Sequence, residues 1–186
     1  MQLDFSELTE QFARTLIYVV GSARGGSTFA NRAIGLHPDL LYVDWNDKTF
    51  SNIWPHIDTL SDEELRRRLF RSSEDSNASI PIEHIDGETL RRWNRHVEHV
   101  FRSRNLREIF CLRGIFYWLT YASEQPLSEL RGWCIKANTW EGVDHLKKAI
   151  PEAQLVFVLR DPRSTALSFA KVYARRRQEH FADHDL

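Results

Sequence analysis

Cysteine, net charge and long apolar runs are all scarce in this sequence. The two cysteines, Cys111 and Cys134, form no CxxC pair and have no histidines or cysteines near them at zinc-ligand spacing, which argues against a disulfide framework or a structural metal. The formal net charge is −1, so the chain lacks the basic field that nonspecific nucleic-acid binding requires, and we expect no nucleic-acid partner. Any anion site must therefore be local.

The apolar residues are enough for a core but not for a membrane span. No run of about 18 apolar residues occurs, and residues 1–14 are acidic and amphipathic rather than basic and then apolar. We therefore expect a cytoplasmic protein without a membrane span. The 186 residues, 42% of them hydrophobic, suit about one domain, so we expect residues 1–186 to form a single domain.

Apolar and amphipathic segments alternate along the chain. Unbroken apolar, β-branched segments predict strands covered on both faces at 16–20, 132–137 and 155–159, and a further short strand at 40–43. Helical spacing predicts helices at 6–12, 29–36, 65–71, 88–104, 106–121, 141–150 and 163–177, although a strand stays open around 109–112. Residues 44–55, polar and aromatic without a period, predict a loop over a site. The alternation predicts a three-layer α/β/α fold with a mainly parallel central sheet, like that of P-loop NTPases.

A glycine-rich loop separates the first predicted strand from its helix. Gly21-x4-Gly26-Ser27-Thr28 has the spacing of a Walker A loop, but Ser27 stands where a nucleotide hydrolase has its lysine. Glycines allow backbone N–H groups to turn inward, and a helix N-terminus attracts an anion, so a phosphate can still bind. The cation has moved to Arg24, facing the side where leaving-group charge develops if a β-sulfuryl group is transferred.

A second cluster follows the last predicted strand. Arg160 stands at the end of that strand, and Ser168 lies about two turns into the next helix, which Asp161 and Pro162 begin. Ligands bind at this edge of open α/β sheets, where an arginine and a hydroxyl can grip one extra phosphate, such as a 3′-phosphate. A salt bridge from Arg160 to Asp161 or Glu152 is the structural alternative.

Together these segments resemble the superfamily of sulfotransferases that use 3′-phosphoadenosine 5′-phosphosulfate (PAPS), including the bacterial and protein-tyrosine enzymes. That superfamily pairs a phosphosulfate loop, basic-Ser-Gly-Thr-Thr, with a downstream Arg-x7-Ser motif. The resemblance spans residues 16–175 and includes His-Pro-Asp at 37–39 and Lys136 at the end of a strand. It implies transfer of a sulfuryl group from PAPS to an acceptor hydroxyl, with 3′,5′-adenosine bisphosphate (PAP) as product and no metal.

The resemblance also implies roles for individual residues. Arg24 would stabilise the transferring sulfuryl group and the bridging oxygen, while Arg160 and Ser168 would bind the 3′-phosphate. The residues implied to hold the 5′-phosphate are Ala23, Arg24, Gly25, Gly26, Ser27 and Thr28.

The sequence departs from the superfamily pattern in several places. Gly25 replaces the usual serine, and Asn138 stands where a proline often follows the lysine. The acidic general base has no clear counterpart: Asp44 is the nearest candidate and Asp47 the next, each also readable as a solvated loop acid. The chain ends soon after the Arg-x7-Ser motif, so we expect the domain to lack the superfamily's C-terminal elements.

The acceptor stays open among small-molecule, glycan and lipid hydroxyls. Four tryptophans are candidates either for an acceptor cleft or for the core: Trp45, Trp54, Trp118 and Trp140. Two other functions also stay open. One is a P-loop small-molecule kinase that uses Mg-ATP, with Asp161 as the only substitute for a Walker B acid; the other is a non-catalytic nucleotide-binding module.

Overall fold

A four-stranded parallel sheet forms the centre of the protein, whose computed structural model describes residues 3–47, 53–70, 85–122 and 125–182, with the backbone alone at 44–46 and 175–182. The strands are β1 (Leu16–Gly21), β2 (Leu40–Asn46), β3 (Gly132–Ala137) and β4 (Gln154–Val158). Their order is β2-β3-β1-β4, and every neighbouring pair is parallel. The carboxyl ends of all four strands therefore meet at one edge of the sheet.

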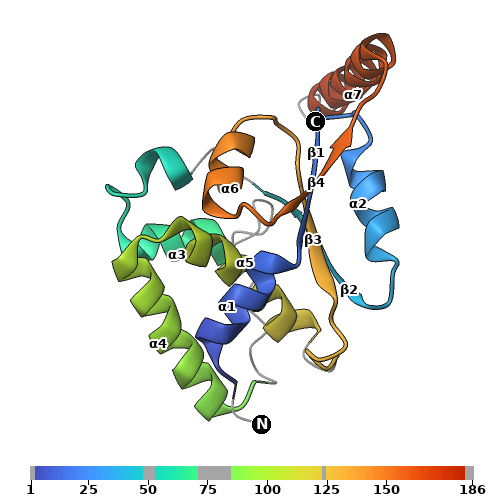
Figure 1. Ribbon diagram of the computed structural model, residues 1–186. Helices are drawn as coiled ribbons and strands as arrows, with labels where there is room; N and C mark the ends of the chain where they lie inside the picture. The colour runs from blue at the N-terminus through green and yellow to red at the C-terminus, as the bar shows by residue number, and fades with distance from the viewer. Residues whose placement is uncertain (1–2, 48–52, 71–84, 123–124, 183–186) are drawn as a thin grey trace.

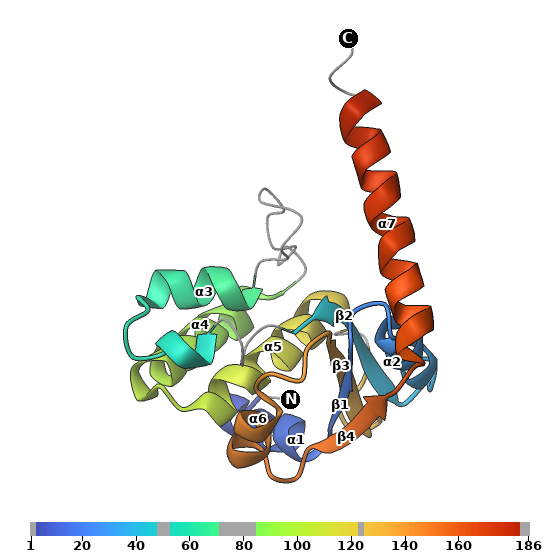
Figure 2. The ribbon, with the colours of Figure 1, turned by 90° about the horizontal axis from the view of Figure 1, so that it is seen from above.

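Helices cover both faces of this sheet. They are α1 (Phe5–Arg14), α2 (Ser27–Gly35), α3 (Asp62–Phe70), α4 (Gly87–Ser103), α5 (Leu106–Tyr121), α6 (Val143–Ala149) and α7 (Pro162–Ala182), with a short 3₁₀ helix, η2 (Trp54–His56). Helix α2 lies on one face, whereas α1 and α5 lie on the other with α3 and α4 outside them (Figure 1). Helix α7 extends away from the rest of the described fold (Figure 2). The predicted α/β/α architecture with a parallel sheet is confirmed.

Polar residues placed just before the helices explain where the helices begin. Asp4, Asp86 and Asn105 each accept hydrogen bonds from two backbone N–H groups at the start of α1, α4 and α5. Ser61 Oγ accepts from the Glu64 N–H at 3.2 Å, as its capping box predicts, and Asp161 Oδ1 accepts from the Arg163 N–H at 2.9 Å. These caps satisfy donors that the first helical turn would otherwise leave without partners.

Helix α5 lies at the centre of the core and settles the alternative left open at residues 109–112, which are helical. The four residues of that segment are fully buried, which is why their composition resembles that of a strand. Gly114 allows the helix to approach the sheet, because a Cβ there would lie 2.7 Å from the Phe12 ring and 3.0 Å from Trp133. Trp133 in turn donates its indole N–H to the Phe12 carbonyl at 2.6 Å.

Strand β2 is longer than the sequence predicts. The prediction ends it at residue 43 and assigns 44–55 to a loop, but the strand continues to Asn46. A register irregularity between Tyr42 and Asn46 lets the strand continue beside β3, where Asn46 pairs with Lys136. The loop prediction was therefore wrong for residues 44–46, and residues 48–52 of it lie outside the described residues.

Strand β4 is less covered than its apolar sequence predicts. Phe157 is 50% exposed and Leu159, just after the strand, is 82% exposed. The reason is position: β4 is the last strand of the described sheet and pairs with β1 alone. The prediction of a strand covered on both faces was wrong here, although the strand itself is confirmed.

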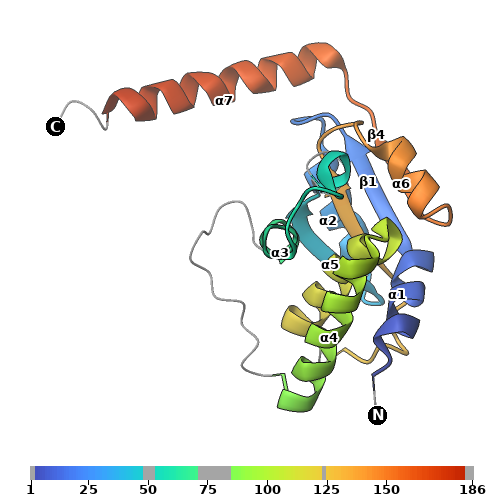
Figure 3. The same ribbon diagram turned by 90° about the vertical axis from the view of Figure 1, so that its left-hand side faces the viewer.

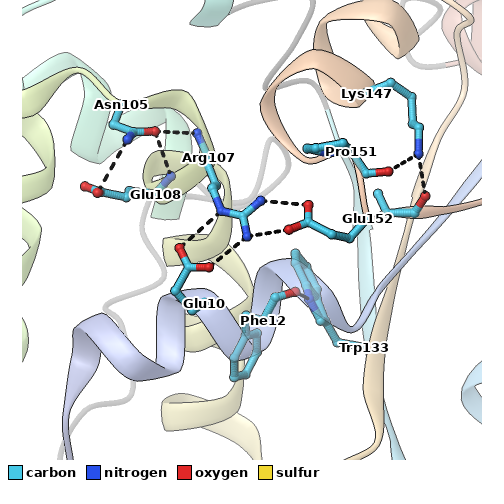
Figure 4. A network of polar contacts seen from close by, with 10 residues as sticks. Glu10, Phe12, Asn105, Arg107, Glu108, Trp133, Lys147, Pro151 and Glu152 are labelled. Atoms are coloured by element: carbon cyan, nitrogen blue, oxygen red, sulfur yellow. Dashed lines mark hydrogen bonds and ion pairs between the residues drawn. The ribbon is translucent and has the colours of Figure 1, made fainter.

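A network of ion pairs and hydrogen bonds connects α1, the start of α5 and the turn between α6 and β4. Arg107 at the start of α5 contacts Glu10 of α1 at 2.9 Å and Glu152, between α6 and β4, at 2.8 Å (Figure 4). Its hydrogen bonds lower the pKa of Glu152 to about 2 and also lower the pKa of Glu10. Lys147 of α6 donates to the Pro151 and Ala153 carbonyls and closes the same turn.

We expect Arg107→Ala to lower the free energy of unfolding by about 1 kcal/mol at pH 7, since both pairs are partly exposed and screened by solvent. A carboxylate whose pKa is lower in the folded than in the unfolded chain stabilises the fold at pH values above its unfolded pKa. This stabilisation is lost as the pH falls toward the folded pKa. The difference between the wild type and the variant should therefore shrink as the pH falls from about 4.5 toward about 2. Thermal unfolding at pH 7 and pH 3 measures it, with Arg102→Ala as the exposed control. A difference that does not depend on pH would contradict this account.

Candidate active site

The glycine-rich loop lies between the carboxyl end of β1 and the start of α2. The Gly25 N–H donates to the Ser22 carbonyl at 2.8 Å and closes a tight turn. Two residues in the loop have positive φ, Arg24 at 64° and Gly26 at 103°. Gly26 is the N-cap residue of α2, so the first N–H groups of that helix face the loop. This is the arrangement that an anion at a helix N-terminus requires.

Gly25, where the superfamily has serine, is required by this loop conformation. A Cβ at position 25 would lie 2.7 Å from the Ser22 carbonyl oxygen and 2.8 Å from Ser22 Oγ. Side chains do not tolerate such contacts unless the backbone moves. The departure from the pattern is therefore explained by the turn itself.

The two sequence motifs meet in space. Arg24 Nε donates to Ser168 Oγ at 3.1 Å, and Arg160 Nη1 donates to the Arg24 carbonyl oxygen at 3.1 Å. Arg24 and Arg160 are exposed, and Ser168 is half-buried. The structure thus brings Arg24, Arg160 and Ser168 together at the sheet edge where ligands of open α/β folds bind.

The structural alternative for Arg160 does not occur among the described residues. Glu152 pairs with Arg107, and Asp161 uses its carboxylate to cap α7. Arg160 instead reaches across to the loop backbone. Its exposed guanidinium has further N–H donors that a phosphate can accept from.

Asn138 is a site residue that the sequence reasoning did not assign. Ser27, at the first position of α2, is buried and donates its hydroxyl proton to Asn138 Oδ1 at 3.1 Å. Asn138 follows β3, the strand whose end carries the buried Lys136. A polar residue just beyond a buried strand, at the edge that carries the loop, was the signal available in the sequence.

The two candidate bases have different outcomes. Asp44 lies in β2 and its side chain is outside the part of the chain that the structure describes, so its role stays a prediction. Asp47 is buried and pairs with Arg113 at 2.8 Å, while Tyr18 Oη donates to its other oxygen at 2.7 Å. The reading of Asp47 as a solvated loop acid was wrong. Both of its carboxylate oxygens hold other side chains in place.

The environment of Tyr18 reflects this buried pair. Burial and the neighbouring Asp47 carboxylate raise the pKa of the tyrosine hydroxyl well above its ordinary value. Arg113 also donates to the Leu69 carbonyl at 3.2 Å, so it connects the end of α3 to Asp47, the residue just after β2. The backbone N–H of Asp47 donates to the Lys136 carbonyl at 2.7 Å. The group therefore fixes residue 47 beside the sheet edge.

The tryptophans divide between core and surface. Trp118 is buried, and Trp54 packs against His145 with ring centroids 5.0 Å apart and planes tilted by 38°. Trp140 is 45% exposed and lies parallel to Phe157, with centroids 5.4 Å apart and planes 13° apart. This aromatic pair stands just after Asn138 and just before Arg160 in the chain. The side chain of Trp45 lies outside the described residues.

The described ranges contain neither a metal-binding cluster nor a membrane-spanning helix. No group of three or more histidine, cysteine, aspartate or glutamate side chains there gathers as a metal site would require. None of the described helices combines the length and the apolar character of a membrane span.

The fold and site define a parallel α/β domain in which a glycine loop without the Walker lysine carries one arginine, Arg24, and contacts a second, Arg160. Residues 17–186 match the sulfotransferase family. The match covers most of the chain and both motifs, and the chain belongs to that family. Neither the curated proteins nor the solved structures include a significant match to it.

Proposed function

We propose that this sulfotransferase transfers a sulfuryl group from PAPS to an acceptor hydroxyl. The observation that carries the proposal is the meeting of Arg24, Ser168 and Arg160 beside the N-terminus of α2. One cation lies on the glycine loop and the second lies at the end of β4. A nucleotide with phosphates at both its 5′ and 3′ positions needs two such separate anion subsites.

The described residues fit a phosphosulfate. The loop turn leaves no room for a side chain at Gly25, and the positive φ of Gly26 precedes the first turn of α2, whose leading N–H groups have no acceptor within the helix. We assign the 5′-phosphate to these backbone N–H groups together with Ser27 and Thr28. The Ser27 hydroxyl now donates to Asn138, and this bond orients it at the base of the loop.

The 3′-phosphate is assigned to Arg160 and Ser168. Arg160 holds the loop carbonyl with one nitrogen, so its guanidinium is already positioned before a ligand arrives. Ser168 accepts from Arg24 and keeps a hydroxyl proton to donate. The same contact keeps Arg24 close to the second subsite.

Transfer requires one bond to form and one to break at sulfur. The acceptor oxygen attacks sulfur as the bond from sulfur to the bridging phosphate oxygen breaks, and PAP leaves with the released electron pair. Arg24 and the α2 N-terminus stabilise the negative charge that develops on the bridging oxygen. The acceptor proton passes to a base, for which we propose Asp44.

The acceptor is a small-molecule, glycan or lipid hydroxyl. Trp140 and Phe157 supply an exposed flat surface beside the site, suited to stacking on a ring of the nucleotide or of the acceptor. Because an aromatic face can stack on many kinds of ring, this surface indicates how a ligand would lie but not which ligand binds.

Arg160→Ala is expected to weaken PAP binding by about 10- to 100-fold, since hydrogen bonds to charged groups contribute about 1.5–3 kcal/mol. Calorimetric titration of the wild-type chain and the variant with PAP measures this loss. Arg163→Ala is the matched control, because Arg163 is exposed three residues further on and its side chain has no hydrogen bond or ion pair among the described residues. The wild-type chain is also titrated with ADP and with Mg-ATP, to compare its affinities for these nucleotides with that for PAP. An unchanged PAP affinity would remove the 3′-phosphate assignment, and a preference for Mg-ATP would favour a kinase.

A further inference from the structure

A pocket lies near the start of α1, away from the glycine loop. It has a volume of about 340 Å³ and lies between the start of α1 and the middle of α4. Its lining residues are Phe5, Ser6, Arg92, Arg95, His96 and His99. Figure 3 shows α1 and α4 beside the N-terminus, far from the start of α7. We refer to it as the α1–α4 pocket.

The charges of α4 leave two arginines available at this pocket. Arg91 pairs with Glu88 at 2.8 Å, and Arg102 lies 4.0 Å from Glu98. These pairs use both acids of the helix. Arg92 and Arg95 have no ion pair within the ranges that the structure describes, and both line the pocket. Arg92 and Arg95 therefore bring positive charge to the pocket, and the nearby Glu88 carboxylate forms its ion pair with Arg91 rather than with them.

The wall of the pocket is held in a fixed position. Phe5 is buried and stacks on His96 with centroids 5.7 Å apart, and His96 Nε2 lies 3.2 Å from Thr9 Oγ1. Trp93 packs against both rings, with its centroid 5.5 Å from that of Phe5 and 6.5 Å from that of His96. The nearby Asp4 carboxylate accepts from backbone N–H groups of α1 and so serves as that helix's cap. A ligand would thus meet a preformed surface.

We propose that the α1–α4 pocket binds a tetrahedral oxyanion, sulfate or phosphate, through Arg92 and Arg95. The planar fork of a guanidinium matches the oxygens of such a group, and two forks one helical turn apart on α4 can hold one ion together. His99 lies on the same wall and offers a further ring nitrogen. The site is separate from the proposed PAPS site and does not depend on it.

The test is an NMR titration of the full chain that follows the imidazole signals of His96 and His99, which report on this pocket alone. The ligands are inorganic sulfate, inorganic phosphate, N-acetylglucosamine 6-sulfate and uncharged N-acetylglucosamine. We expect saturable shifts with the anions and none with the uncharged sugar. Tighter binding of the sulfated sugar than of sulfate would identify an ester as the ligand, and equal binding would identify the free ion.

The matched variants lie on the same helix. Arg92→Ala/Arg95→Ala should weaken binding by at least about tenfold, as expected for lost charged hydrogen bonds. Arg91→Ala/Arg102→Ala removes equal charge from pairs outside the pocket and should leave the affinity unchanged. Absent shifts in the wild-type chain, or equal losses in both variants, would overturn the proposal. Unfolding midpoints confirm that both variants are folded, and a PAP titration reports separately on the other site.

Discussion

Replacing Arg113 by methionine is expected to lower the free energy of unfolding by about 3–5 kcal/mol, because it removes the guanidinium that pairs with the buried Asp47 carboxylate. Arg113 and Asp47 lie 2.8 Å apart with side chains that are 6% and 1% exposed. Methionine keeps much of the side-chain volume, so the loss reflects the missing charge and its hydrogen bonds, including that to the Leu69 carbonyl, rather than a cavity. Urea unfolding at pH 7 followed by circular dichroism gives the difference.

Two further variants separate charge from packing. Arg67→Met breaks an exposed pair with Glu64, and its unfolding midpoint should stay close to that of the wild type. Arg113→Met/Asp47→Asn removes the stranded charge and should recover part of the lost stability. If the double variant is as unstable as Arg113→Met, the buried charge is not the cause.

Arg24→Ala is expected to lower the rate of sulfuryl transfer by about 10²- to 10³-fold, the effect of removing one donor that acts on transition-state charge. The affinity for PAP should change little, because Arg160 binds the backbone carbonyl of residue 24 rather than its side chain. Alanine has the same Cβ as arginine, so the positive φ at this position adds no new strain. Formation of PAP from PAPS, with a panel of hydroxyl acceptors, measures the rate.

The matched control for this variant is Arg32→Ala. Arg32 lies on α2 but donates to Tyr42 Oη at 3.2 Å, away from the loop. Its transfer rate should stay within a few-fold of the wild type. A parallel loss of PAP affinity and rate in Arg24→Ala would make Arg24 a binding residue and remove its role in the transition state.

The sequence predicted those parts of the site that follow from strand direction. Arg24 comes after β1 and Arg160 after β4, and parallel neighbours deliver such residues to one edge. The direct contact between Arg24 and Ser168 confirms that the two motifs meet. Whether these residues bind PAPS stays a prediction until nucleotide binding is measured.

Other parts of the site depend on contacts between residues far apart in the sequence, which local sequence patterns do not predict. Asn138 looked like a missing proline, yet it holds Ser27 across the sheet edge. Asp47 lay in a predicted loop, and its partner Arg113 comes from the middle of α5. An arginine within an apolar helical run requires a buried counter-charge, which was the available signal. Choosing the acid required the tertiary structure.

The exposure of β4 also depended on tertiary position. The apolar sequence of β4 indicates that the strand tolerates burial on both faces, but it does not indicate whether a further layer covers those faces. Strand order alone places it at the edge of the described sheet. Apolar strands at sheet edges will be predicted as buried whenever periodicity is the only guide.

The bond between Arg160 and the Arg24 carbonyl joins residues 136 positions apart, and this has a consequence for how the protein folds. Closing so long a segment costs chain entropy that only nearby contacts formed at the same time can offset. The glycine loop can form its turn early, but its partner Arg160 is synthesised 136 residues after Arg24. A ribosome-bound chain that ends before residue 160 would therefore hold the glycine loop without Arg160, and the contact between them would form only as β4 docks beside β1.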